Sequence, residues 1–558
     1  MLINANEFAE NAVINTEICI IGAGPAGITL AREFLGQTTE VYLLESGDTT
    51  SQAAIQTLSE CQTYGDPFLS PQATRHRQFG GNSNIWAIKL DRSTIGVRYA
   101  PLDAIDFERR DWLPYSGWPF PKSHLDPFYE RAQAVCQAGP YAYDAEAWQR
   151  PDSQPLPLNP DRFETAVFQF GPRQVFYQDY RNALAQANNI KVCVDSTVVE
   201  IEAHESRQAV TRVKVSTFAG KQFWIAAKFF VSAQGGIENA RLLLASNRQQ
   251  PAGLGNQYDV VGRYFMDHPL VDAGMLIPRD PNLFNKTALY DLRWVDNTPI
   301  LGKLAPSPTL MQQKHLLNLA VLAFPRPSWR QFKAMAAFKT VTEAGVRGKL
   351  PDQLPQHLWH ILGGLDYIAR AGYLAATQHQ SLLHGFGRGG WSEMPDNRQR
   401  FRMFQFFFQT EQAPDPSNRV FLSAERDRFG YPKAALHWQW GSIDRSSAAH
   451  NQKLLAEKLA NAGIGELTYD AAQAPALCSP SGVAHHMGTT RMHADPKQGV
   501  VDQNCRVHQL ANLYVAGSSV FPTGGSANPT LTIVALSLRL ADHLKQAIKT
   551  TSVAGLMS

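Results

Sequence analysis

The chain has 558 residues, a net charge of +3 and 44% hydrophobic residues. This length predicts at least two domains, and so small a net charge gives no indication of a nucleic-acid partner. The six cysteines are scattered along the chain without a C-x-x-C pair. We therefore expect neither a metal site nor a redox-active disulfide.

The N-terminal segment 1–17 has neither the basic start nor the apolar run of a secretory signal peptide. The chain also contains no stretch of about 18 uncharged apolar residues, which a transmembrane helix needs. We therefore expect a cytoplasmic protein without a transmembrane helix, and association with a membrane surface stays open.

Residues 16–47 predict a βαβ unit. Apolar residues at 18–21 predict a buried parallel strand, and an amphipathic helix at 26–35 follows it directly. A second strand at 41–44 completes the unit. A unit of about 30 residues with this order of elements is typical of dinucleotide-binding domains.

Three glycines and one acidic residue of this unit are suited to binding a dinucleotide. Gly22, Gly24 and Gly27 form the pattern G-x-G-x-x-G between strand and helix. They allow a tight turn, close approach of the backbone to a pyrophosphate, and close packing of the helix on the strand. Glu45, after the second strand, can accept hydrogen bonds from a ribose. The pattern predicts a dinucleotide site and leaves open whether the cofactor is FAD or NAD.

Two later segments also bring paired glycines after apolar residues. The first is RHRQFGGNSNIWAIKLDR at 75–92, in which the glycine pair can approach a flat or charged group, or can belong to an ordinary loop. The second lies in the α/β block at 190–245, where the pair Gly235–Gly236 separates a buried strand from a helix. This arrangement predicts a second approach of backbone to a cofactor.

Residues 271–440 differ in character, because strand-like runs alternate with turns and predict an antiparallel sheet. Within them, residues 328–384 form a helical insert that contains five basic residues before an apolar segment. One interpretation is a surface helix pair packed on the sheet. The others are a lid, a membrane-surface helix or a docking site for a partner.

The last 80 residues carry two dense motifs, AHHMGTTRM at 484–492 and GSSVFPTGGSANPTLTIVALSLRLADHL at 517–544. The first places two histidines before a Gly–Thr turn. The second predicts a turn followed by a long amphipathic helix, whose first N–H groups are free to bind an acceptor.

Together these motifs resemble the glucose–methanol–choline (GMC) family of FAD-dependent oxidoreductases over nearly the whole chain. The resemblance rests on GAGPAG with its acid, on FGGNSNIW, FVSAQGGIENARLLLAS and VGRYFMDHP, and on the two C-terminal motifs in this order. It implies FAD as the cofactor, in place of NAD.

The resemblance also implies the fold. We expect a Rossmann-like α/β FAD-binding domain that is discontinuous, and an α+β substrate domain with a mainly antiparallel sheet. The FAD-binding domain would comprise residues 1–95, 166–268 and 479–558. The substrate domain would comprise residues 96–165 and 269–478, and would carry the helical insert.

Carried over residue by residue, the family pattern implies a set of cofactor-binding positions. They follow the FAD from its pyrophosphate and ribose, through the adenine, to the ribityl chain and flavin ring. They are Gly22, Gly24, Gly27, Glu45, Gly81, Asn84, Val198, Gly235, Gly517, Asn528, Pro529 and Thr530.

The family's two active-site positions match His485 and Asn528. His485 suits a base with a pKa near neutrality, and the Asn528 amide can donate to the substrate oxygen. His486 should point to the opposite face, because adjacent residues of an extended segment alternate. Several family members attach FAD covalently to a histidine after the glycine pair, but residues 82–86 contain none. We therefore expect non-covalent FAD.

The resemblance implies oxidation of the CH–OH group of a small-molecule alcohol, sugar or polyol, by hydride transfer to flavin N5 with His485 as base. The alternatives are a non-redox enzyme of the same fold, such as a hydroxynitrile lyase or photodecarboxylase, and an oxidase of a sterol or lipid alcohol. The electron acceptor stays open among oxygen, a quinone and a cytochrome. A peripheral membrane or a redox partner could bind the insert 328–384.

Overall fold

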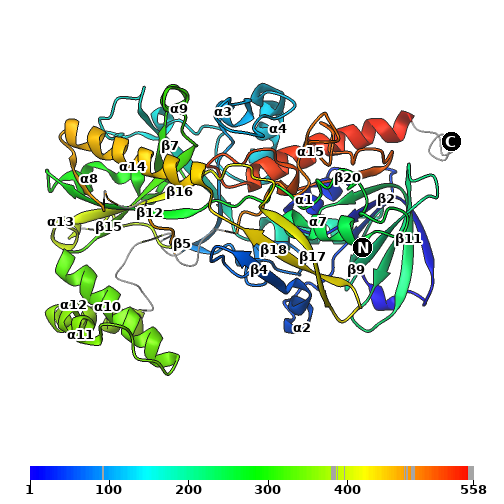
Figure 1. Cartoon of the computed structure of the whole chain (residues 1–558), viewed down its shortest axis with the longest axis horizontal. Helices are drawn as coiled ribbons and strands as arrows, with labels where there is room; N and C mark the ends of the chain where they lie inside the picture. The colour runs from blue at the N-terminus through cyan, green and yellow to red at the C-terminus, as the bar shows by residue number, and fades with distance from the viewer. Residues whose placement is uncertain are drawn as a thin grey trace.

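The computed structural model describes residues 1–90, 93–378, 385, 387–394, 396–470, 472, 475–478 and 484–550. Figure 1 shows two large sheets at opposite ends of an elongated molecule, with a small sheet between them. The last residues of the insert, 379–384, lie outside the described residues.

An eight-stranded sheet contains the predicted βαβ unit. Its strand order is β1-β8-β3-β2-β11-β10-β9, and β20 pairs with β11. All pairs are parallel except those that β10 makes with β9 and β11. The strands are β1 (Leu2–Asn4), β2 (Val13–Ile21), β3 (Val41–Leu44), β8 (Ile190–Val194), β9 (Thr197–Ala203), β10 (Val210–Ser216), β11 (Gln222–Ser232) and β20 (Leu513–Val515).

The parallel strands are buried because helices cover them. Residues Ile18 to Ile21 of β2 are all at most 1% exposed, as expected for a strand with both faces covered. The helices of this part are α1 (Pro25–Arg32), α6 (Tyr180–Gln186), α7 (Gly235–Ala245) and α15 (Thr530–Thr550). The predicted Rossmann-like α/β fold is confirmed.

The second large sheet is antiparallel throughout, with the order β19-β12-β16-β15-β14-β7-β6-β5, and β13 pairs with β14. This confirms the predicted antiparallel sheet. Its strands are β5 (Ile88–Leu90), β6 (Ser93–Tyr99), β7 (Phe163–Pro172), β12 (Leu270–Pro278), β13 (Leu292–Val295), β14 (Thr298–Pro306), β15 (Leu319–Arg326), β16 (Met403–Thr410) and β19 (Gly465–Thr468).

A third sheet joins segments far apart in the sequence. A hairpin forms from β17 (Arg419–Arg426) and β18 (Pro432–Trp438), and β18 pairs in parallel with β4 (Cys61–Gly65). The remaining helices are α2 (Ala53–Gln56), α3 (Ala104–Phe107), α4 (Lys122–Val135), α5 (Ala145–Trp148), α8 (Leu283–Lys286), α9 (Pro308–Lys314), α10 (Trp329–Val346), α11 (Leu354–Gly363), α12 (Leu365–Gln378), α13 (Asn397–Arg400) and α14 (Ser442–Asn461).

The domain division stays a prediction, and the sheets suggest an adjustment to it. The expected boundaries at residues 95 and 166 fall inside β6 and β7, which pair with each other within the nine-stranded sheet. We propose boundaries before β5 and after β7, because a strand is held by the sheet to which it is hydrogen-bonded.

Candidate active site

A cavity of about 220 Å³ lies where three helices of the α/β part begin. The first residues of α1, α7 and α15, which are Pro25, Gly235 and Thr530, all line it. Neither α1 nor α7 has a side-chain cap, so their first N–H groups are left for another acceptor. Helix N-termini with free N–H groups favour phosphate and other anions.

Glycines shape the wall of this cavity. A β-carbon on Gly24, Gly235 or Gly517 would meet nothing within 4 Å, and all three residues line the cavity. By contrast, a β-carbon on Gly27 would lie 2.0 Å from the Gly22 carbonyl oxygen, so Gly27 serves the close packing of helix on strand. The first three therefore leave bare backbone facing open space, where a flat or phosphorylated group can approach closely.

Glu45 also lines the cavity, although it is only 6% exposed. Its carboxylate accepts hydrogen bonds from the backbone N–H groups of Ala23, at 3.1 Å, and Gly47, at 2.9 Å. Burial raises the pKa of this carboxyl, and the two backbone donors act in the opposite direction. The carboxylate is thus fixed at the end of β3, where it can accept further hydrogen bonds.

The other expected cofactor residues divide into two groups. Gly22, Gly81 and Pro529 line the cavity. Asn84 lies outside the lining, and its amide donates to the carbonyl oxygens of Phe79 and Gly81 at 2.9 and 2.8 Å. Asn84 therefore stabilises the conformation of the glycine loop and does not itself line the cavity.

Val198 is likewise outside the cavity lining, buried in β9, where it pairs with Val215. Asn528 does not line the cavity either, but it contacts His485.

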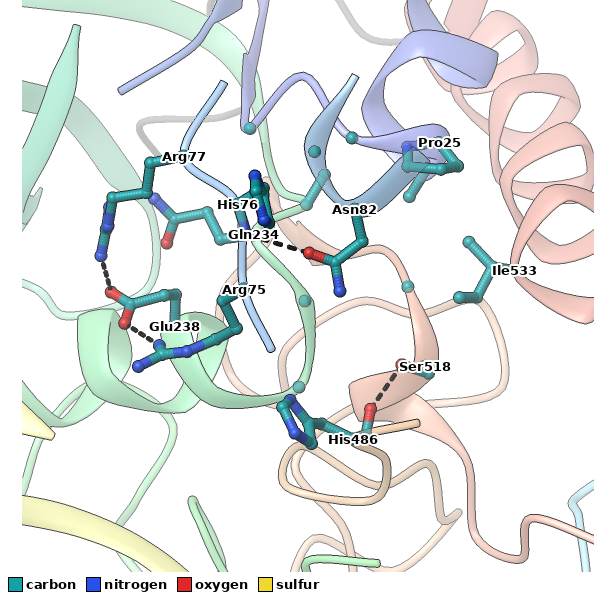
Figure 2. Close-up of a pocket in the computed structure, with 18 of the residues that line it drawn as sticks. Pro25, Arg75, His76, Arg77, Asn82, Gln234, Glu238, His486, Ser518 and Ile533 are labelled. Carbon is teal, nitrogen blue, oxygen red and sulfur yellow. Dashed lines mark hydrogen bonds and ion pairs between the residues drawn. The ribbon is translucent and has the colours of Figure 1, made fainter. Parts of the chain in front are cut away.

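A buried ionic cluster borders one side of the cavity (Figure 2). Glu238 of α7 forms ion pairs with Arg75, with Arg77 at 2.8 Å and with Arg241 at 3.3 Å, and Arg241 also pairs with Asp427 at 2.8 Å. Burial alone would raise the pKa of Glu238, but the three guanidinium groups hold it well below its usual range. Within this cluster three cations thus surround two carboxylates.

His485, which also lines the cavity, belongs to a chain of hydrogen bonds that leads to two strands of the nine-stranded sheet. Its Nε2 accepts from Asn528 Nδ2 at 3.1 Å, and its Nδ1 lies 2.8 Å from Nδ1 of His268. Asn528 Oδ1 accepts from Gln409 Nε2 at 3.2 Å, and Gln409 Oε1 accepts from Arg98 at 2.8 Å. Strands β16 and β6 thus orient the amide that contacts the histidine.

The backbone of His485 is fixed as well. Its N–H donates to Asp267 Oδ1 at 2.9 Å, and the same oxygen accepts from the His268 N–H at 2.6 Å. The preceding Ala484 has a φ of +63°, a conformation that is uncommon for a residue with a β-carbon. Asp267 therefore fixes the backbone of His485 and His268 relative to each other.

Both facing histidines are neutral in this environment. Burial lowers the pKa of His485 well below its ordinary value, and the nearby His268 and Arg98 lower it further. Burial also lowers the pKa of His268 to about 4. A neutral imidazole has one nitrogen that accepts a proton, which is what a general base requires.

His485 and His486 both line the cavity, but their rings contact different groups. The ring of His485 faces His268, whereas the ring of His486 packs beside Phe68 and Phe265 and lies 3.4 Å from Thr74 Oγ1. Burial lowers the pKa of His486 to about 3. Its carbonyl accepts from Ser518 Oγ at 2.6 Å (Figure 2), and this bond ties the histidine segment to the turn after β20.

Several residues of this region escaped the sequence analysis. His268 and Asp267 lie in VGRYFMDHP, which was noted only as a motif, and Arg75 and Arg77 precede the noted glycine pair. Their positions within or next to these motifs were the only feature of the sequence that could have indicated a role in the site. Nothing local indicated that Glu238 would pair with either arginine.

Comparisons with known proteins agree with this geometry. Residues 414–537 match the GMC oxidoreductase family model. The chain is 25% identical to the fructose dehydrogenase large subunit of Gluconobacter japonicus over 66% of its own length, which corresponds to 56% of that subunit. It is 23% identical to the 6'''-hydroxyparomomycin C oxidase of Streptomyces lividus over 95% of its length and 92% of that protein.

The solved structures include a formate oxidase of Aspergillus oryzae, with a TM-score of 0.52 and 15% identity over 97% of this chain and 100% of that one. An identity this low supports a shared fold alone. Fold, cavity and sequence matches agree in their likeness to the GMC oxidoreductases, and the family model itself matches the C-terminal segment 414–537.

Proposed function

We propose that the chain is an FAD-dependent oxidoreductase that oxidises a CH–OH group of a sugar or another polyol, with His485 as the base. The similar proteins support this substrate class by their names, which include fructose dehydrogenase, pyranose 2-oxidase and 2-methyl-1,2-propanediol dehydrogenase. Because the first of these matches covers 56% of the relative's length, the activity is a proposal for this chain.

The cavity residues fit FAD. Gly24, Gly235 and Gly517 leave the open backbone that a dinucleotide needs, and the N-termini of α1 and α7 suit its pyrophosphate. Glu45 would accept hydrogen bonds from the ribose. When bound, FAD supplies the acceptor for the hydride that leaves the substrate carbon. The protein then has to place the alcohol and remove its proton.

The observation that carries the proposal is the fixed, neutral His485 at the cavity. Its Nδ1 is engaged by His268, so Nε2 is the nitrogen that would take the proton, once the substrate hydroxyl replaces the Asn528 amide as its hydrogen-bond donor. Asn528 Nδ2 touches this same nitrogen at 3.1 Å. The amide carries a second N–H, which can donate to the substrate oxygen as negative charge develops there.

His268 has a positioning role in this proposal. It holds the ring of His485 in one orientation and in one tautomer, as the partners of catalytic histidines do in other enzymes. Gln409 plays the corresponding part for Asn528, because it fixes the amide oxygen and so directs the N–H groups toward His485.

The test is an anaerobic panel of sugars, polyols and simple alcohols mixed with the purified, FAD-loaded protein. We expect at least one polyol to bleach the flavin absorbance, and air or a quinone to restore it. Comparison of the two acceptors separates an oxidase from a dehydrogenase. If no alcohol bleaches the flavin although dithionite does, the proposed activity is wrong while the cofactor assignment stands.

A further inference from the structure

The helical insert stands away from the rest of the molecule. Figure 1 shows α10, α11 and α12 projecting together from one end of the nine-stranded sheet. They pack on one another through small residues, and a β-carbon on Gly364 would lie 2.4 Å from the β-carbon of Ala334. Ala337 of α10 is also buried, and so is Tyr367 of α12, which lies near Arg326 of β15 and Arg400 of α13. The insert is thus not the helix pair packed on the sheet that the sequence also allowed.

This narrow contact between the helices leaves bulky apolar side chains in solvent. Helix α11 has no buried residue. Nine of the seventeen large hydrophobic side chains that are exposed among the described residues belong to the insert. They are Trp329, Phe338, Val346, Leu350, Leu358, Trp359, Leu362, Leu365 and Tyr373. Such a concentration within about a tenth of the chain indicates an interaction surface.

Two parts of the insert are especially bare. Trp359 of α11 is 75% exposed. Val346, the last residue of α10, is 90% exposed, and Leu350 in the loop that follows is 82% exposed. Arg347 and Lys349 lie between them in the sequence, so two basic side chains are flanked by two apolar ones where α10 ends.

The charge of the chain is also concentrated here. Residues 328–378 contain six Lys or Arg against three Asp or Glu, a net charge of +3 that equals the charge of the whole chain. Two of the acids face cations, Asp366 facing Arg330 at 3.4 Å and Glu343 facing Lys339 at 3.7 Å. Among described residues, no carboxylate lies within 4.0 Å of the remaining insert cations Lys333, Arg347 and Lys349.

We propose that this insert docks on an anionic phospholipid surface. Trp359 and Leu362 of α11, Val346 at the end of α10 and Leu350 of the loop after it would enter the headgroup region. Basic residues beside them would bind the lipid phosphates. No described helix has the length and hydropathy to cross a bilayer, so the contact is peripheral. Mixed tryptophan, leucine and basic side chains are typical of segments that lie in a membrane interface.

The charge pattern favours an anionic lipid surface over a neutral protein partner. A neutral protein surface would cover the apolar side chains but leave the unpaired cations without a counter-charge. An anionic bilayer supplies both an apolar interior and a layer of phosphate groups. Binding to it does not require a complementary shape of the protein surface. The docking is independent of the proposed reaction, because it involves no residue of the cavity.

The experiment is co-sedimentation of the full-length, FAD-loaded protein with vesicles. Vesicles of phosphatidylglycerol and phosphatidylcholine are compared with vesicles of phosphatidylcholine alone. We expect binding to the anionic vesicles at low salt, weaker binding as salt screens the charges, and little binding to the neutral vesicles. No binding to anionic vesicles at low salt would overturn the proposal.

Two variants and their controls locate the surface. Arg347→Gln with Lys349→Gln should weaken binding by about 25-fold, since each basic group near an anionic surface contributes about fivefold. Lys314→Gln with Lys453→Gln removes the same charge from exposed positions elsewhere and should leave binding unchanged. Equal losses in the two pairs would indicate a net-charge effect and contradict a docking surface.

Trp359→Ser with Leu362→Ser should weaken binding by about tenfold or more, whereas Tyr258→Ser, at a residue that is 44% exposed on another part of the protein, should not. Sedimentation velocity without vesicles is run in parallel. If the wild-type protein is a dimer that Trp359→Ser with Leu362→Ser dissociates, the surface binds a second copy, and the lipid proposal is wrong.

Discussion

His485 and His268 face each other through their Nδ1 atoms, which are 2.8 Å apart with the rings nearly perpendicular at 82°. Only one of these nitrogens can carry a proton in the bond. His268 Nε2 lies 3.4 Å from the Gly524 carbonyl, which can only accept. The network therefore assigns the His268 proton to Nε2 and the shared proton to His485 Nδ1. This leaves Nε2 of His485 as the basic nitrogen.

The first prediction concerns His268. Replacement by Leu removes the acceptor for His485 Nδ1–H, so the ring can rotate and change tautomer. We expect flavin reduction to slow by about 10–100-fold, the cost that is typical when a metal-binding histidine loses its hydrogen-bond partner. His268→Gln keeps a side-chain acceptor and should recover part of the rate. Anaerobic stopped-flow absorbance, with the acid limb of the pH profile, measures both variants.

A purely structural role for His268 would give a different result. The rate would then follow FAD content and thermal stability, and the acid limb would stay at the same pH in both variants. A displaced limb in His268→Leu and a smaller displacement in His268→Gln support the positioning role.

The second prediction concerns Asn528. Asn528→Ala removes the N–H groups that face His485 Nε2 and, in the proposed reaction, the substrate oxygen. Because such a hydrogen bond strengthens as charge develops, the loss should fall on the chemical step, at about 10²–10³-fold. The acid limb of the pH profile should persist. Single-turnover rates at saturating substrate test this, and a change confined to substrate affinity would contradict it.

The parts of the fold that could be predicted are those whose elements are neighbours in the sequence. The strand, glycine turn, helix and second strand at 16–47 are neighbours in sequence, and α1 and β3 appear where the pattern placed them. The antiparallel sheet was equally readable from its alternating runs. The pairing of β4 with β18 was not, because nothing in either segment specifies a partner more than 370 residues away.

The active site shows the same limit. The C-terminal motifs indicated His485 and Asn528, but His268 and Gln409 reach them from other strands and segments. The polar side chains along β16 and just after it are engaged within the protein, Gln409 by Asn528 and Glu411 by a buried ion pair with Arg110.

The third prediction tests the cofactor cradle. Gly24 has a φ of −83° and open space beyond it, so Gly24→Val should leave the fold intact but fill the cavity wall. We expect FAD affinity to fall by about 10–100-fold, the cost of overpacking a fitted site. Gly345→Val is the matched control, since it too meets nothing within 4 Å but lies in α10. Flavin absorbance per protein measures the loss, and equal FAD content in the two variants would contradict the assignment.

The fourth prediction concerns the attachment of FAD. Because residues 82–86 contain no histidine, we expect acid or heat to release the flavin into the supernatant. The structure adds one residue to consider, because His76 also lines the cavity (Figure 2). Flavin that stays with the precipitated protein would contradict non-covalent binding, and peptide mapping would then show whether His76 carries it.

The most direct test of the central claim is the pH dependence of flavin reduction in wild type and His485→Ala, measured anaerobically in a single turnover with a substrate from the panel. Neutral His485 is the reactive form, so the wild-type rate should fall as the pH drops through its pKa. Because that pKa is lowered, the fall should begin below the ordinary value of about 6.5. His485→Ala should lose about 10²–10⁴-fold in rate and lose the acid limb. An unchanged rate and pH profile in His485→Ala, with full FAD content, would remove His485 from the reaction.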